Sequence, residues 1–449
     1  MAAGPCAELP ASGGRRLGRF ASWCALRDLN EALASAYKVN PRLDAARATL
    51  RATDEEVPRA ISGYRPIVTG NADTTFQYTT TLPSTIANGG SNPRVYSVQL
   101  VQPLFRGFRV VNTVAEAEAT VRAGRETLRS VEQSVLLEAV TTYMDVVRDQ
   151  ALVRLRENNV TVLTRDLRAT QDRFKVREVT RTDVAQAEAR RAAAVSALAL
   201  SKANLQTSRA TYERVIGHPP SKLVESRPSG LVPKTLKDGC EISAGENPAV
   251  VGALYREQGA RHAINRICGE QLPSAQLEVG YQRRFDDNIG IDSRATTTLI
   301  GRLTVPFYSG GEVEARIRQA KHTHVSRLQE IEQARSEVLA QVVTAWSQLI
   351  AARAQLESDQ TSVDANRIAL AGVREEERVG QRTLLDVLNA EQEMLNSEVN
   401  LITTKRNLAV ALYNVLVTIG RLNSQELGLA SLVYDLEAHY LEVRRKWFE

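Results

Sequence analysis

An internal repeat constrains this 449-residue chain more than any other feature. The segment Pro103-Leu-Phe-Arg-Gly107 matches Pro306-Phe-Tyr-Ser-Gly310 at an offset of 306 − 103 = 203 residues, and the same offset carries residues 180–184 onto residues 383–387. Because two copies of one unit build the same elements twice, the repeat has to be found before any element is assigned.

Each copy predicts the same order of elements. A short helix is followed by two strands, a very long helix, a tight turn and a long returning helix. The boundaries expected from the repeat are residues 1–28 without an assigned role, 29–217 for the first copy (strands about 67–105, helical hairpin about 107–217), 218–246 as a linker, 247–420 for the second copy (strands about 276–307, helical hairpin about 311–420) and 421–449 as a C-terminal segment.

The long helices carry heptad seams. Apolar residues recur at spacings of three and four between residues 338 and 356 and again between residues 385 and 416, where only Gln392 and Arg406 interrupt the stripe. This pattern predicts coiled-coil packing of antiparallel helices. A helix over residues 108–173 would be roughly 100 Å long at 1.5 Å per residue, so we expect a rod rather than a globule.

The segments before each long helix read as strands with partial period-two alternation. Tyr96, Val98 and Leu100 share one face. Their lengths suit tilted membrane-crossing strands, which need about 9–11 residues. Two hairpins give four strands per chain, too few to close a barrel, so several chains would have to share one. The expected strands are Ile67 to Tyr78, Arg94 to Phe105, Gln276 to Phe285 and Arg294 to Phe307.

The turns between the long helices have explicit capping chemistry. In the second copy Gly380 suits a left-handed helix end, and Thr383 with Asp386 three residues later predicts a capping box. Residues 180–183 of the first copy repeat the cap, but Arg177 stands where the glycine would be. That turn therefore either tolerates strain or takes another conformation.

These residues together resemble the TolC family of outer-membrane channel-tunnels over about residues 29–428. The resemblance rests on PLFRG and PFYSGG at the strand-to-helix junctions and on VGQRTLLDVLNAE at the second turn. It implies a mainly α fold with membrane β-strands. Three chains would form a homotrimer in which three sets of four strands make one 12-stranded outer-membrane β-barrel, continuous with a 12-helix periplasmic α-barrel. The linker and the C-terminal segment would lie in the equatorial region.

The same resemblance implies a passive exit duct of a type I secretion or multidrug efflux system. Its location would be the cell outer membrane, with the helical tunnel in the periplasm. Its cargo would be exported proteins or small toxic compounds. The implied partners are a periplasmic adaptor, an inner-membrane transporter of the ABC or RND type, and outer-membrane lipid.

Family positions also fall on the turns. The resemblance implies that Asp386 narrows the periplasmic aperture. At the position where the family has a second aspartate, this chain has Asn389. With one ring of carboxylates instead of two, we expect a weaker preference for cations. Glu377 replaces the tyrosine of the family latch and would repel Asp183 unless Arg382 bridges both. The implied latch residues are Arg382, Thr182, Asp183 and Glu377, and the implied adaptor-contacting tip residues are Val176, Arg177, Thr180, Val379, Gly380 and Thr383.

Simpler interpretations of these residues stay open. Asp183 and Asp386 are also explained as first-turn residues that favour the helix dipole. Arg382 is also explained as a solvated turn residue. An alternative function is a structural or adaptor-like coiled-coil protein without a channel. The alternative predicts that the strand segments are ordinary soluble strands, so whether the protein requires detergent to stay in solution would distinguish the two functions.

Other classes find little support in the composition. The 57 basic and 52 acidic residues are interspersed, which does not favour nucleic acid as a partner. No nucleophile motif, phosphate loop or metal-ligand set is present, so we expect no enzymatic activity, cofactor or metal. Cys240 and Cys268 could pair in an oxidising compartment.

Overall fold

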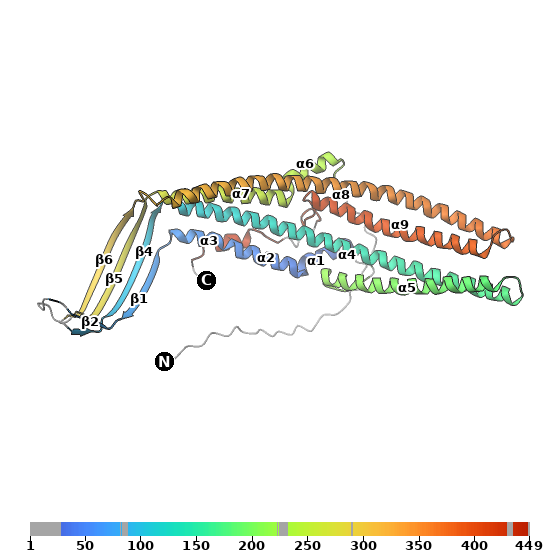
Figure 1. Ribbon diagram of the computed structural model, residues 1–449, viewed down its shortest axis with the longest axis horizontal. Coiled ribbons are helices and arrows are strands. Elements are labelled where there is room, and N and C mark those ends of the chain that lie inside the picture. The colour runs from blue at the N-terminus through green and yellow to red at the C-terminus, as the bar shows by residue number, and fades with distance from the viewer. Residues whose placement is uncertain are drawn as a thin grey trace.

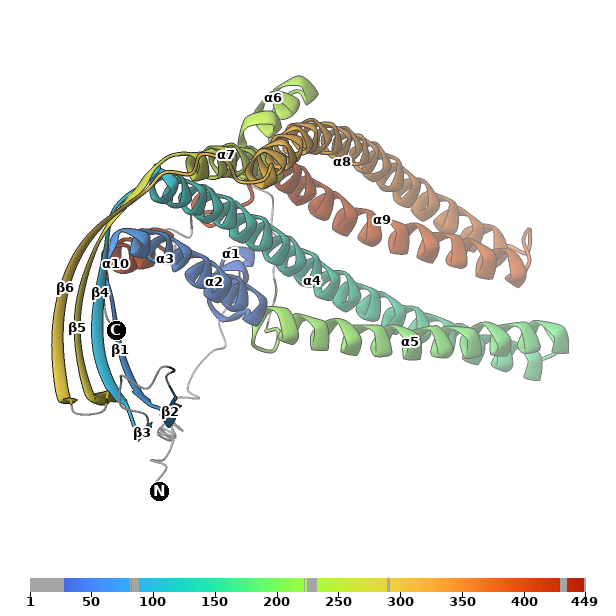
Figure 2. The same ribbon diagram turned by 60° about the vertical axis from the view of Figure 1, so that its left-hand side comes forward.

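The computed structural model describes residues 28–80, 82, 89–221, 223, 232–288, 291–428 and 434–447. These residues form an elongated molecule with a curved sheet at one end and two long helical hairpins that extend from it (Figures 1 and 2). No helix among them combines the length and the apolar character needed to cross a membrane. Cys6 and Cys24 lie outside the described residues, as does most of the N-terminal segment.

The first copy of the repeat runs from a group of short helices through strands into a long hairpin. Its elements are α1 (Leu29–Val39), α2 (Pro41–Asp54), α3 (Glu56–Ile61), the 3-10 helix η1 (Ser62–Tyr64), β1 (Ile67–Thr74), β2 (Gln77–Thr79), β3 (Gly89–Ser91), β4 (Arg94–Arg106), α4 (Arg109–Lys175) and α5 (Arg181–Ile216).

The second copy repeats this order and adds a short C-terminal helix. Its elements are α6 (Leu236–Glu246), α7 (Pro248–Cys268), the 3-10 helix η2 (Gly269–Gln271), β5 (Ser274–Asn288), β6 (Ile291–Thr304), α8 (Glu312–Arg378), α9 (Leu384–Thr418) and α10 (Ala438–Val443). Both long helices, α4 and α8, have 67 residues.

The four long strands form one antiparallel sheet in the order β1-β4-β5-β6. The two copies meet in its centre, where Leu100 of β4 lies opposite Val279 of β5. The prediction that the last strand reaches Phe307 is wrong, because β6 ends at Thr304, two residues before Pro306. Proline has no N–H for the ladder, which favours an end there. The predicted first strand is likewise split, since β2 leaves the sheet to pair with β3.

The helical hairpins pack through the predicted seams. Val338, Val342, Ala345 and Leu349 of α8 are all buried and belong to one core cluster with residues of α9. The same cluster takes in α1 and the first hairpin, where the ring centroids of the two buried tyrosines of α4 and α5 lie 6.4 Å apart. The coiled-coil prediction is therefore confirmed for these helices.

A close backbone approach joins sheet and helices. Gly107 has φ +59°, and a Cβ added there would lie 2.3 Å from the carbonyl oxygen of Gly269. A Cβ on Gly269 would meet the Gly107 carbonyl at the same distance. Any side chain at either position would force the two backbones apart, so the bend between the strands and the rod requires glycine at both.

Cys240 and Cys268 are free thiols. Cys240 lies in α6 and Cys268 ends α7, a helix of 21 residues that spans about 30 Å. A disulfide requires Cα atoms within about 7 Å. The pairing considered from the sequence is therefore not formed, because α7 carries the second thiol away from the first.

Candidate functional site

The second helical turn positions Asp386 through the predicted capping box. The Thr383 hydroxyl accepts a hydrogen bond from the Asp386 N–H at 3.3 Å, and the Asp386 carboxylate accepts from the Thr383 N–H at 3.0 Å and from its hydroxyl at 2.8 Å. These hydrogen bonds, backbone first, lower the pKa of Asp386 below its ordinary value. The carboxylate is therefore fixed in place and ionised at neutral pH.

The first turn has the same box but a different helix end. Thr180 and Asp183 exchange hydrogen bonds of 2.8 and 3.3 Å, which confirms the cap. Arg177 adopts φ 64°, and Gly380 in the other turn adopts φ 80°. The first turn therefore keeps the left-handed conformation and accepts the strain of a side chain there.

Arg382 is paired within its own hairpin. Its Nε lies 2.9 Å from Glu376 Oε2, and both side chains are about half exposed. Asp183 is engaged by the Thr180 cap. The latch between Arg382 and Thr182 or Asp183 stays a prediction.

Glu377 forms an ion pair with a residue of the other hairpin. Arg173 Nη1 of α4 lies 2.7 Å from Glu377 Oε1 of α8, which links the two hairpins near their ends. A second link joins Arg190 Nη2 of α5 to Asn389 Oδ1 of α9 at 2.7 Å. Asn389, expected only as the uncharged counterpart of an aperture aspartate, thus also joins the hairpins.

Arg173 and Arg190 were not identified from the sequence. A signal for them exists in the repeat, because the offset of 203 places them on Glu376 and Glu393. The charge therefore reverses between the copies at both positions. Opposite charges at equivalent positions would have pointed to attraction between the two hairpins.

Further from the turns, carboxyls are buried between the hairpins. Glu391 of α9 is 8% exposed and accepts a hydrogen bond from Arg374. Burial, with the nearby charge of Glu391, raises the pKa of Asp166 on α4 to about 6. One oxygen of each carboxyl is buried without a hydrogen-bond partner. The contact between α4 and α9 therefore contains a group that titrates near neutral pH.

The outermost residues of the turns are apolar and exposed. Val176 is 72% exposed and Val379 is 64% exposed, at equivalent positions of the two copies. Among the residues that the structure describes, no group of three or more His, Cys, Asp or Glu side chains could hold a metal ion. The far end of the molecule thus offers charged and apolar contacts.

Duplicated strand hairpins, paired helical rods and charged turns at the far end define an outer-membrane channel-tunnel. The chain belongs to the outer membrane efflux protein family, which it matches over residues 32–218 and 242–421. It is 36% identical to outer membrane efflux protein BepC of Brucella suis over 94% of this chain and 91% of that protein. It is also 24% identical to the alkaline protease secretion protein AprF of Pseudomonas aeruginosa, over 75% of this chain and 72% of that protein.

Solved structures agree on the fold. The outer membrane channel CmeC of Campylobacter jejuni superposes with a TM-score of 0.79 at 17% identity, over 93% of this chain and 89% of that chain. The outer membrane protein VceC of Vibrio cholerae gives a TM-score of 0.74 at 16% identity, over 87% of this chain and 96% of that chain.

Family membership decides between the two functions considered from the sequence. The protein is an outer-membrane exit duct of a type I secretion or efflux system, with its helical tunnel in the periplasm. It acts as a homotrimer with a periplasmic adaptor and an inner-membrane transporter. The coiled-coil scaffold without a channel is not supported.

Proposed function

We propose that the helical turns form a gated, cation-attracting aperture at the periplasmic end of the duct. The carboxylate of Asp386 carries this proposal. It is held by the backbone and hydroxyl of Thr383, and its pKa is lowered, so three copies would form a fixed ring of negative charge. Rings of carboxylates attract cations at a constriction.

A single ring makes the aperture less selective than two would. Asn389 carries no charge, and its side-chain oxygen accepts a hydrogen bond from Arg190. It therefore contributes a link between hairpins rather than a second ring. We expect cation preference to depend on Asp386 alone.

Arg382 is proposed as the latch that keeps the aperture closed. Its guanidinium is half exposed and bonded through Nε to Glu376, which leaves further N–H donors for Thr182 and Asp183. Glu377, whose charge Arg173 offsets, would lie beside this latch without repelling Asp183. When the aperture opens, the hydrogen bonds of Arg382 to Thr182 and Asp183 would be replaced by hydrogen bonds to water.

The trimer is supported by a difference between the copies. Leu136 and Val140 of α4 are completely buried, but their equivalents Leu339 and Val343 on α8 are 49% and 42% exposed. Ile350 continues this stripe at 54% exposure. Apolar surface at positions that are core in the other copy fits a helix of a neighbouring chain, and the equivalent covering helix would be its α5.

The cargo and the adaptor both meet the protein at the end that carries the helical turns. The relatives include proteins named for efflux and for protease secretion. We propose that the duct passes whatever its transporter delivers, and that the adaptor binds the exposed tips around Val176 and Val379. Apolar side chains exposed at a tip are suited to such docking. Arg177, Thr180, Gly380 and Thr383 shape these tips.

Single-channel recording in a planar bilayer tests the aperture. Arg382→Ala should raise the open fraction, because it removes the proposed latch. Arg378→Ala is the matched control, since Arg378 pairs with Glu375 on the same helix face at 3.0 Å. An unchanged open fraction in Arg382→Ala, or an equal rise in Arg378→Ala, would remove Arg382 from the latch.

A further inference from the structure

Arg406 interrupts the apolar stripe of α9, and the tip aperture does not explain it. Its side chain is only 20% exposed, which is low for an arginine. Placing a charge in a helix seam costs stability unless the charge is paired. The position therefore calls for a partner on a neighbouring helix.

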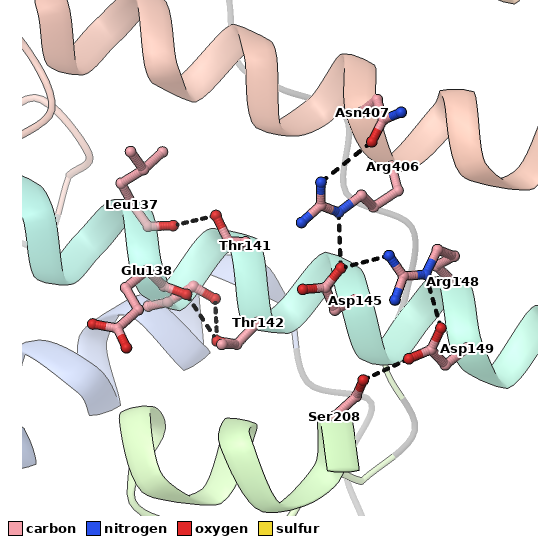
Figure 3. Close-up of polar contacts among 11 residues, drawn as sticks. Leu137, Glu138, Thr141, Thr142, Asp145, Arg148, Asp149, Ser208, Arg406 and Asn407 are labelled. Atoms are coloured by element: carbon pink, nitrogen blue, oxygen red, sulfur yellow. Dashed lines mark hydrogen bonds and ion pairs between the residues drawn. The ribbon is translucent and has the colours of Figure 1, made fainter. Parts of the chain in front are cut away.

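That partner belongs to the other hairpin. Arg406 Nε lies 2.8 Å from Asp145 Oδ1 on α4, and Arg148 Nη1 lies 3.0 Å from the same oxygen (Figure 3). Arg148 Nε also bonds to Asp149 Oδ1 at 2.8 Å, and Asp149 accepts a hydrogen bond from Ser208 of α5. These five residues, here called the Arg406 network, connect α9 through α4 to α5.

The Arg406 network is partly protected from water. The side chain of Asp149 is 5% exposed and that of Asp145 is 24% exposed. Ion pairs at this depth are screened less than surface pairs, and removing one partner leaves the other charge unsatisfied. The network is therefore a contact that resists separation of the two hairpins halfway along α4.

The other copy of the repeat has no such network. At the offset of 203, all five positions hold residues that carry no charge and, with one exception, no polar side chain. The counterparts of Asp145, Arg148, Asp149, Arg406 and Ser208 are Gln348, Ala351, Ala352, Ala203 and Ala411.

A hollow occupies this place in the second hairpin. A cavity of about 440 Å³ is lined by ten residues of α8 and α9, which include Gln348, Ala351 and Ala411 and, at its edge, Arg406 itself. Ala203 and Gln348 are also the positions that would meet between α5 and α8 of neighbouring chains. The charged link thus has no counterpart at the equivalent positions of the repeat.

We propose that Arg406 is a gating residue, whose bond to Asp145 holds the second helical hairpin against the first and must break before the hairpins can separate. This inference rests on the proposed gating of the duct, but it assigns control to a place distant from the turns. The hairpins also meet at Arg173–Glu377 and Arg190–Asn389. Those two links are more exposed than the partly buried Arg406–Asp145 pair, which would therefore offer the greater resistance.

Single-channel recording of full-length trimers tests the proposal. Arg406→Ala and Asp145→Asn should each raise the ratio of open to closed time by roughly tenfold, the factor expected for one charge-assisted hydrogen bond. The double variant should rise no further than either single variant, because both remove the same bond. Arg406→Lys, which keeps the charge, should recover most of the closed state.

The conductance of the open state and its block by multivalent cations should be unchanged in Arg406→Ala, since the aperture keeps its carboxylates. A merely weakened fold would not leave both intact. Lys202→Ala is the matched control, because Lys202 pairs with Glu157 within the first hairpin at 2.9 Å. Its open fraction should equal that of the unmodified protein.

Three results would overturn the proposal: an unchanged open fraction in Arg406→Ala, additive effects of the two single variants, or an equal rise in Lys202→Ala. If Arg406→Ala does not form trimers, Arg406→Gln provides the same test with a smaller loss of packing. A response to Arg382→Ala without a response at Arg406 would reject this inference alone. No response to either would count against gating at the aperture as well.

Discussion

Arg177 and Gly380 occupy equivalent left-handed positions in the two helical turns, with φ 64° and φ 80°. Glycine adopts this conformation freely, whereas a residue with a Cβ pays about 1–2 kcal/mol. The cap that follows is the same in both turns, so the first turn holds its shape against this strain. The two tips are alike in backbone and differ in stored strain.

Arg177→Gly should stabilise the first turn. Relief of the left-handed strain exceeds the added chain entropy of glycine, so we expect a net gain of about 0.5–1 kcal/mol. Amide hydrogen exchange of residues near the turn measures the gain directly. The reverse substitution, Gly380→Arg, should speed exchange at the second turn, and slower exchange there would contradict the strain argument.

Asp386 has two separable roles, as a cap and as a charge. Asp386→Asn keeps a side-chain oxygen for the Thr383 N–H but removes the charge, so it should weaken block by multivalent cations while preserving the turn. Asp386→Ala should weaken block and also destabilise the start of α9, because it removes the N3 carboxylate of the capping box. Current recordings with added trivalent cations, alongside hydrogen exchange, separate the effects. Full block in Asp386→Asn would leave only the capping role.

Asp166 makes the contact between hairpins depend on pH. Burial and the charge of Glu391 raise its pKa from 3.8 to about 6, whereas Arg374 and Arg165 oppose the rise and Glu377 adds to it. The folded state therefore binds a proton more tightly than the unfolded state. The stabilisation by that proton is complete below about pH 4 and is lost as pH rises through about 6.

Asp166→Asn should accordingly stabilise the protein at pH 7.5 by on the order of 1 kcal/mol, after allowance for partial exposure. It should also flatten the change in thermal midpoint between pH 7.5 and pH 5. Thermal unfolding in detergent at both pH values gives the comparison. A variant that keeps the full pH dependence of the unmodified protein would exclude Asp166 as its source.

The exposed stripe on α8 should be required for the trimer. Leu339→Glu places a charge where a neighbouring chain would cover an apolar side chain, and the full burial of one leucine contributes about 1.5–3 kcal/mol. We expect loss of the trimer, measured as mass in detergent by light scattering. Thr344→Glu, an exposed position on another face of α8, should remain trimeric. A trimeric Leu339→Glu would move the interface elsewhere.

Local and periodic features of this fold could be predicted from the sequence. The seams and both capping boxes depend on residues a few positions apart, and the repeat depends on one constant offset. The spacing of Thr383 and Asp386 was therefore sufficient to predict the second box. The choice between strain and another conformation at Arg177 could not be made, because it depends on what the rest of the turn enforces.

Partners across helices could not be predicted. Arg406 was recognised as a break in the stripe, but Asp145 lies 261 residues away in the chain. Glu377 was expected to repel Asp183 unless Arg382 bridged both, whereas the arginine that pairs with Glu377 is Arg173. Such pairs depend on the rotation of one long helix against another, and a heptad pattern specifies the buried face of a helix without naming the neighbour.

The most direct test is single-channel recording of the detergent-purified protein, with its oligomer mass determined on the same sample. For a gated duct we predict a species of three times 49.4 kDa that conducts in discrete steps. Its open fraction should rise in Arg382→Ala. A detergent-independent species that never conducts, with or without Arg382, would contradict it.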